Sequence, residues 1–332
     1  MASYRITVAG VGGAGGQCVQ RMVDDGLSGV RCIAVDTDWA SLALLTVPTR
    51  LRIGEHLTRG LGAGGRQELG ARAAEEAREA IRQALGAPDL AYVVAGLGGG
   101  TGTGAAPVVA GIARETGALT VGVATLPFAF EGARRRRIAG EGLPAFRESV
   151  HTLILVPDEA ALGLMDPHST TILGAFKAID GIVALAVRSV TDLLVRPGLL
   201  LINLDTLRDL LVEGGRACFG FAEAEGEERA LRAAEGALAC PLLGVPLATA
   251  AGLIVNVTGG PDLALIEVKE AVEAIVGAAG PDPRLVYGCV IEDAMAGRVR
   301  VSLLATGLPV SSIPVYRLAP GVAPQAPFSR AT

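Results

Sequence analysis

Glycine dominates residues 96–104, which read GLGGGTGTG: six of the nine residues are glycine and two are threonine. A strand-like run, 90–95, precedes the stretch. An apolar run from Ala105, with Pro107 near its expected first turn, predicts a helix after it. Successive backbone N–H groups in such a loop can surround an anion, and the helix start adds a favourable dipole. The spacing is therefore typical of a phosphate-binding loop, in which Thr101 and Thr103 supply two hydroxyl groups.

Two further glycine loops follow earlier strands. Residues 10–17 read GVGGAGGQ and contain GxGxxG, with Asp36 at the distance expected of a ribose-binding acid. Residues 60–65 read GLGAGG. The first of these loops alone is compatible with a dinucleotide-binding oxidoreductase, which needs one pyrophosphate cradle. Three glycine loops at one sheet edge suit a triphosphate better.

The charge of the phosphates would have to be balanced without lysine. The Walker-type pattern GxxxxGK[ST] is absent from the sequence, and none of the three glycine loops contains a lysine. Backbone dipoles are therefore expected to carry that role.

Composition indicates an ordinary globular chain and excludes several function classes. Hydrophobic residues make up 50% of the 332 residues, charged residues 19%, and the net charge of −5 disfavours non-specific nucleic-acid binding. The three histidines are far apart and predict no metal site. The five cysteines form no CxxC pair, which indicates buried free thiols in a reducing compartment. They are Cys18, Cys32, Cys218, Cys240 and Cys289.

The start of the chain and its apolar runs predict a cytoplasmic protein without direct membrane insertion. No signal peptide is visible before the first strand-like run, and no run reaches about 18 uninterrupted apolar residues.

Strand-like and helix-like stretches alternate over the first half of the chain, which predicts a doubly wound parallel sheet of the α/β class. Strands are expected at 5–9, 31–35, 91–95, 119–124 and 152–156. Helices are expected at 14–24, 66–85, 105–116 and 139–149.

The second half departs from this alternation. Apolar residues at three-to-four spacing predict one long helix over 171–195, ended by Arg196-Pro-Gly. A smaller unit follows, with helices expected near 227–239 and 262–277 and strands at 252–257, 285–291 and 298–305. The expected organisation is a nucleotide-binding domain (1–170), a central helix (171–196), a second domain (197–308) and a short mobile tail (309–332).

The run GGGTGTG is the signature of the tubulin/FtsZ family, and the chain resembles bacterial FtsZ from about residue 4 to residue 308. The supporting stretches occur in order: GVGGAGG (10–16), GLSGVRCIAVDTD (26–38), HLTRGLGAGG (56–65), PFAFEGARRR (127–136), VRPG (195–198), CPLL (240–243) and LLATGL (303–308). The resemblance implies a parallel-sheet GTPase domain, a long central helix and a second, smaller α+β domain. It implies a GTPase whose subunits stack head to tail into filaments.

The resemblance also assigns the nucleotide contacts, with GTP or GDP as ligand and Mg²⁺ bound through the nucleotide. The implied phosphate contacts are Gly13, Ala14, Gly15, Gly16, Gln17, Gly99, Gly100, Thr101, Gly102 and Thr103. Ala63, Gly64 and Gly65 would lie near the γ-phosphate, and Glu131 and Arg135 near the ribose and phosphates.

Phe176 and Asp180 lie four residues apart on one face of the long helix. A ring there can stack on a purine, and a carboxylate can accept the guanine N1–H and N2–H₂ pair. Phe176 alone is equally compatible with core packing, but Asp180 beside it and the glycine loops favour contact with guanine. Asp36 and Asp158 stand where the family usually has asparagine, and so add negative charge near a polyanion. The exposed-looking run 134–137, four arginines, can offset that charge or form a solvated basic face.

In the family, a loop of the form Asn-x-Asp-x-x-Asp reaches the γ-phosphate of the neighbouring subunit. Counted without gaps from Arg196, the pattern falls on Leu201, Asn203 and Thr206. Shifted by two residues, its last position falls on Arg208. Neither alignment contains the final aspartate. The candidate catalytic residues, acting on the next subunit, are therefore Asn203, Asp205 and Asp209, and slow hydrolysis is expected.

Two functions are compatible with these observations. The preferred one is an FtsZ-like GTPase that forms homopolymers, in cell division or a related filament role. The alternative is a filament protein with little or no hydrolysis that co-assembles with a conventional FtsZ. Only about two dozen residues follow LLATGL, and IPVYR (313–317) only weakly resembles the family's docking peptide. The short tail therefore does not favour a link to membrane-tethering partners. It favours a specialised paralogue instead.

Overall fold

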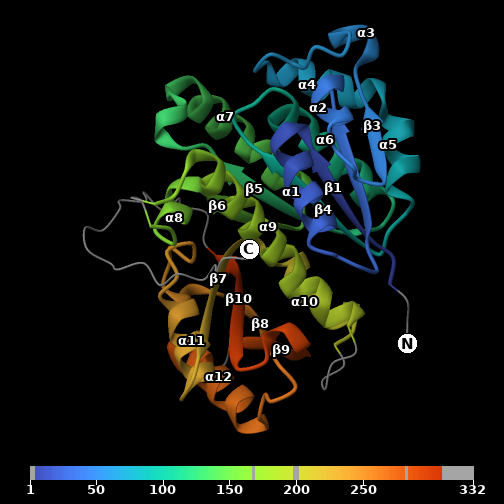
Figure 1. The fold of residues 1–332 in the computed structure, drawn as a ribbon. Helices are drawn as coiled ribbons and strands as arrows, with labels where there is room; N and C mark the ends of the chain where they lie inside the picture. The colour runs from blue at the N-terminus through green and yellow to red at the C-terminus, as the bar shows by residue number, and fades with distance from the viewer. Residues whose placement is uncertain (1–3, 167–168, 197–201, 281–282, 309–332) are drawn as a thin grey trace. The chain divides into compact units, whose positions relative to one another are not determined.

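The computed structural model describes residues 4–166, 169–196, 202–280 and 283–308 (Figure 1). The chain divides into two compact units. The first is Met1–Asp158 with Ile179–Ala184, and the second is Glu159–Ala178 with Leu185–Thr332. The predicted tail, with IPVYR, lies outside the described residues.

The first unit contains six parallel strands in the order β3-β2-β1-β4-β5-β6. They are β1 (Ile6–Val11), β2 (Arg31–Asp36), β3 (Thr49–Arg52), β4 (Leu90–Gly96), β5 (Leu119–Leu126) and β6 (Thr152–Pro157). The chain reverses its direction of travel across the sheet between β1 and β4. The carboxyl ends of these two strands therefore flank the crevice where doubly wound sheets bind ligands.

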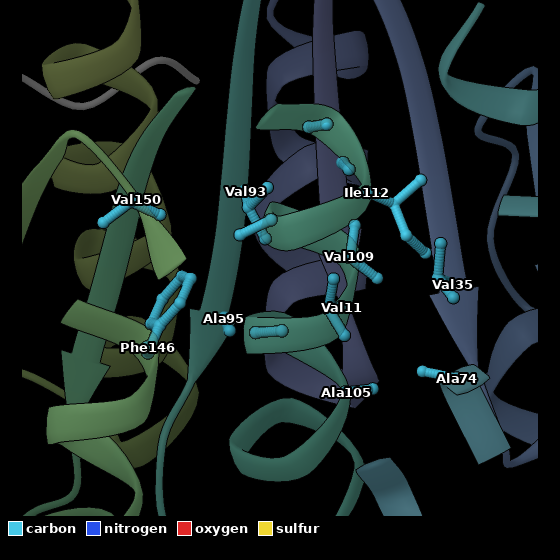
Figure 2. Packing of buried hydrophobic residues seen from close by; sticks show 14 of the residues in the cluster. Val11, Val35, Ala74, Val93, Ala95, Ala105, Val109, Ile112, Phe146 and Val150 are labelled. Carbon is cyan, nitrogen blue, oxygen red and sulfur yellow. The ribbon is translucent and has the colours of Figure 1, made fainter. Parts of the chain in front are cut away.

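Helices cover both faces of this sheet. They are α1 (Gly12–Asp24), α2 (Trp39–Ala43), α3 (Glu55–Thr58), α4 (Gln67–Glu76), α5 (Arg78–Leu85), α6 (Thr101–Glu115) and α7 (Ala133–Ser149). Figure 2 shows Val109 and Ile112 of α6 packed near Val11, Val35 and Val93 of three strands, all of them buried. Because strand side chains alternate between faces, the neighbouring positions meet α1 on the other side of the sheet.

The second unit has four strands in the order β7-β10-β8-β9, and only the β8–β9 pair is parallel. The strands are β7 (Gly215–Glu225), β8 (Gly252–Gly259), β9 (Arg284–Ile291) and β10 (Arg298–Leu308). Helices α11 (Arg229–Leu238) and α12 (Leu265–Ala278) pack their buried residues on this sheet. The remaining helices are α8 (Asp158–Leu162), α9 (Ile172–Val195) and α10 (Leu204–Val212). The predicted fold class, parallel α/β followed by a smaller α+β unit, is confirmed.

Several element boundaries differ from the sequence prediction. Helix α6 begins at Thr101 rather than Ala105, so Pro107 lies inside the helix and not in its first turn. The helix predicted over 66–85 is interrupted at Ala77. Helix α7 begins at Ala133 and includes the arginine run. Strands β3 and β7 had not been predicted. The half-exposed β3 has no clear apolar alternation. In β7 glycine and charged residues interrupt the apolar pattern that would indicate a strand.

The early start of α6 has a packing cause. Gly104 lies so close to α4 that an added Cβ would stand 1.9 Å from the Gln67 carbonyl oxygen and 2.7 Å from the Ala71 nitrogen. Glycine is a poor helix former in general, but here only glycine allows the two helix backbones to approach so closely. The glycine-threonine run is thus both helix and packing surface.

This contact predicts opposite effects for two glycine-to-alanine changes on the same helix. Gly104→Ala is expected to lower the free energy of unfolding by about 1–3 kcal/mol because backbone atoms must move apart. Gly111→Ala has nothing within 4 Å of the added methyl group. It should raise the free energy of unfolding by up to about 1 kcal/mol through helix propensity. Chemical denaturation measures both, and equal effects from the two changes would contradict the packing account.

Candidate nucleotide-binding site

Two helix N-termini meet at the crevice of the first unit. Strands β1 and β4 are neighbours, α1 follows β1 directly at Gly12, and α6 begins five residues after β4. A Cβ on Gly12 would stand 2.7 Å from the backbone nitrogen of Gly102, so the first turns of α1 and α6 are in contact. The first N–H groups of each helix have no partner within the helix, and both dipoles place positive charge there. The arrangement is suited to bind an anion.

The third glycine loop packs against the same point. A Cβ on Gly100 would lie 2.7 Å from the Ala63 side chain and 2.9 Å from the Arg66 nitrogen. Gly70, on α4, similarly faces the Gly100 carbonyl oxygen at 2.3 Å. The structure therefore brings the three glycine loops together at the carboxyl edge of the sheet, as the sequence predicted.

A different set of glycines leaves its backbone open. An added Cβ would meet nothing within 4 Å at Gly13, Gly64 or Gly99, one in each of the three loops. Gly64 also has a positive φ of 58°. Of the neighbouring predicted contacts, Ala14 and Gln17 are exposed, whereas Gly15 and Gly16 are buried. Bare backbone thus faces open space beside two helix N-termini, which fits a phosphate chain.

The threonine hydroxyls of the signature hold the loops in place. Thr103 Oγ1 accepts a 2.9 Å hydrogen bond from the Gly98 N–H, and Thr103 is only 2% exposed. Thr101 Oγ1 is 2.6 Å from Thr37 Oγ1, at the end of β2. Their direct contact with phosphate stays a prediction. The sequence does not single out Thr37, because its partner Thr101 lies 64 positions away in the chain.

Residues 131–135, at the start of α7, lie against two of the loops. Glu131 accepts the Phe128 N–H and pairs with Arg135 at 2.5 Å, and their contact with the ribose and phosphates stays a prediction. The Arg135 carbonyl oxygen lies 2.8 Å from the Cβ position of Gly98. The guanidinium of Arg134, one of the four arginines of the run 134–137, stands 3.5 Å from the Cβ position of Gly65. It places a cation beside the third glycine loop, residues 60–65.

Asp36 does not have the environment of a ribose-binding acid. Its side chain is 5% exposed, and Oδ1 accepts the N–H groups of Thr37 at 2.7 Å and Asp38 at 3.2 Å. Burial raises the pKa of Asp36, and these amides oppose the shift. The carboxylate of Asp36 is hydrogen-bonded to the backbone of its own turn. The acid on which the oxidoreductase interpretation depended is therefore not presented to a ligand.

Helix α9 supplies the carboxylate assigned to the base. Asp180 is half-buried and accepts a hydrogen bond at 3.0 Å from the thiol of Cys18, on α1. Phe176 is one turn earlier on α9 and is 39% exposed, so core packing does not bury its ring. It belongs to the second unit, and its contact with a base stays a prediction. All five cysteines are free and buried, as predicted.

The candidate catalytic segment starts α10. Asn203 is the N-cap, and its Oδ1 accepts both the N–H and the hydroxyl of Thr206. Thr206, Asp205 and Asp209 are all exposed on this helix. Asp205 and Asp209 share a face, since they lie four residues apart. The segment 197–201, with Leu201, lies outside the described residues.

In the described part of the chain, no helix is long and apolar enough to cross a membrane. Within the same residues, no group of three or more histidine, cysteine, aspartate or glutamate side chains could hold a metal ion.

Comparison with known proteins identifies the family. Residues 5–166 match the GTPase domain of the Tubulin/FtsZ family, and residues 215–309 match the C-terminal domain of the FtsZ family. An empty FtsZ dimer from M. jannaschii is 38% identical, with a TM-score of 0.88 over 92% of this chain and 88% of that one. CetZ2 from Haloferax volcanii, solved as a GTPγS-bound protofilament, is 25% identical. Its TM-score is 0.77 over 92% of this chain and 94% of that one. The glycine loops, their geometry and these matches agree: the chain belongs to the tubulin/FtsZ family and carries its GTPase domain, which implies a guanine nucleotide as ligand.

Proposed function

We propose that this protein binds GTP at the crevice of the first unit and assembles head to tail into filaments, with hydrolysis completed by the adjacent subunit and slowed by an altered acidic segment. The observation that carries the proposal is the contact between the first turns of α1 and α6, with Gly13, Gly64 and Gly99 open beside it. Backbone amides at two helix starts can balance a triphosphate without lysine.

Each group of predicted contacts has a distinct role in this proposal. The amides of the open loops hold the phosphates, and Arg134 adds a cation beside Gly65. The Glu131–Arg135 pair lies toward the ribose, and Asp180 accepts the N1–H and N2–H₂ of guanine. Mg²⁺ enters bound to the nucleotide. The carboxylates of α10 position water beside the neighbour's γ-phosphate, which is catalysis by positioning and electrostatics.

Filament assembly is supported by the relatives. The M. jannaschii protein was solved as a dimer and CetZ2 as a GTPγS-bound protofilament. A head-to-tail contact would bring α10 of one subunit over the nucleotide of the next. Cell division or a specialised filament role follows from the family.

The phosphate site can be tested by filling its open space. Gly13→Leu places a good helix former in the first turn of α1, where an added Cβ meets nothing within 4 Å. We expect an unchanged midpoint of thermal unfolding without nucleotide and an affinity for GTP lower by about tenfold or more, since the side chain occupies the phosphate position. Titration calorimetry measures the affinity.

Trp39, the single tryptophan, gives a second measurement. Its ring lies against Gly60, where a Cβ would stand 2.6 Å from it, so its fluorescence reports on the third loop. Gly111→Ala, on the far part of α6, is the matched control. Undiminished GTP binding by Gly13→Leu would refute the placement of the phosphates.

Hydrolysis should depend on the acids at the start of α10. Asp205→Ala and Asp209→Ala are each expected to lower phosphate release, whereas Thr206→Asp, which places an acid at the final position of the family pattern, should raise it by about tenfold or more. An acid is also favourable in the first turn of a helix. GTP affinity of the isolated subunit should not change, because in this proposal these residues act on the nucleotide of the neighbouring subunit.

Glu213→Ala, an exposed carboxylate at the other end of α10, controls for a general loss of negative charge. Phosphate release as fast as in a conventional FtsZ, and unaffected by loss of Asp205 and Asp209, would rule the slowed mechanism out.

The alternative function, co-assembly with a conventional FtsZ, is favoured by one observation, the threonine at position 206. A partner subunit would then supply the missing acid. Mixing the two proteins should increase phosphate release above the sum of the separate rates, and the mixed filaments should contain both chains. Separate filaments with additive rates would count against this alternative.

A further inference from the structure

The contact between Cys18 and Asp180 is unusual among the buried thiols. Cys18 is 1% exposed, and its sulfur lies 3.0 Å from Oδ1 of Asp180. The two residues are 162 positions apart in the chain but belong to the same compact unit. Cys32, also buried in that unit, has its pKa raised by burial alone. Cys18 therefore differs from a thiol buried among apolar atoms, because its sulfur forms a hydrogen bond with a carboxylate.

The direction of this hydrogen bond follows from the surroundings. Burial, followed by the nearby charge of Asp180, raises the pKa of Cys18 well above its ordinary value, and Asp158 adds to the effect. The sulfur therefore stays protonated and donates. Burial raises the pKa of Asp180 as well, while the Cys18 hydrogen bond and the charge of Arg21 lower it. The thiol and Arg21 both lie on α1 and together favour the ionised carboxylate.

A carboxylate that must accept two parallel N–H groups needs a fixed plane. The last torsion of an aspartate side chain has a broad minimum, so an isolated carboxylate turns easily. Each carboxylate oxygen has two acceptor positions, and the thiol uses only one of those on Oδ1. The other oxygen and the remaining position stay available, because Asp180 is only half-buried.

We propose that Cys18 is a positioning residue that holds the Asp180 carboxylate in the orientation that selects guanine. This inference rests on the proposed function, because it assumes that Asp180 meets the base. A thiol is a weak donor, so it fixes the plane without competing strongly with the base for the same oxygen. Selectivity for the base, rather than phosphate binding, is the property that should depend on it.

The test compares affinities for GTP, ITP and ATP by titration calorimetry, with the full chain at concentrations below filament formation. Inosine lacks the 2-amino group, and adenine lacks both donors. Cys18→Ala is expected to lower the preference for GTP over ATP by about tenfold, the effect of weakening a hydrogen bond to a charged group. Cys18→Ser keeps a donor and should retain most of the preference, and Cys32→Ala should leave it unchanged.

The pH dependence of GTP affinity separates positioning from simple packing. Guanine needs the ionised form of Asp180, so affinity falls as the pH is lowered through the pKa of that group. Removing the thiol donor removes an interaction that lowers the pKa of Asp180. The fall should therefore begin at a higher pH in Cys18→Ala than in the wild type, and Cys18→Ser should follow the wild type.

The outcomes distinguish the two proposals. If Cys18→Ala keeps the wild-type preference and the wild-type pH profile while Asp180→Ala loses the preference, the role of Cys18 is refuted and the guanine contact stands. If Asp180→Ala keeps the preference, the assignment of the base contact fails, and the role of Cys18 fails with it. Thermal unfolding without nucleotide identifies any variant that has not folded.

Discussion

Close contact between loop backbones is the constraint on which the nucleotide site depends. Gly12 meets Gly102, and Gly100 meets Ala63 and Arg66, at distances that leave no room for a side chain. These contacts align the first turns of two helices at one strand edge. Without them the amides would point to separate places, and their partial charges would not act on one ligand. The glycines of the three loops are therefore of two kinds: many pack closely on neighbouring parts of the chain, and Gly13, Gly64 and Gly99 stay open.

The distribution of charge follows from that constraint. The three loops contain no lysine, so in the proposed function aligned amides balance the phosphate charge, and the guanidinium of Arg134 beside Gly65 is added from α7. Aligned amides can bind phosphates, but they supply no acid or base for hydrolysis. In the proposed function that chemistry comes from α10, where Asn203 is committed to capping the helix and binds Thr206. Binding and turnover can then vary independently.

Much of this could be predicted from the sequence, and the remainder has identifiable causes. The three loops, the parallel sheet and the long helix α9 followed from periodicity, glycine spacing and a family signature. The start of α6 at Thr101 could not be predicted, because glycine-rich runs are ordinarily loops. The helix here depends on the contact between Gly104 and Gln67, which are distant in sequence. The contacts of Thr37 and Cys18 could not be predicted, because each acts through a partner distant in sequence, and the arginine run 134–137 did not reveal which of its members lies beside Gly65.

The central claim is that each subunit binds GTP but the catalytic site is complete only between two subunits. Sedimentation with GTP, GDP and a non-hydrolysable analogue tests this claim most directly. Phosphate release is measured on the same samples over a range of protein concentrations. The account predicts pelleting with GTP and with the analogue but not with GDP, and phosphate release that begins only above the concentration at which filaments form. Two results would contradict the account: pelleting to the same extent with every nucleotide, or phosphate release proportional to protein concentration even at the lowest concentrations.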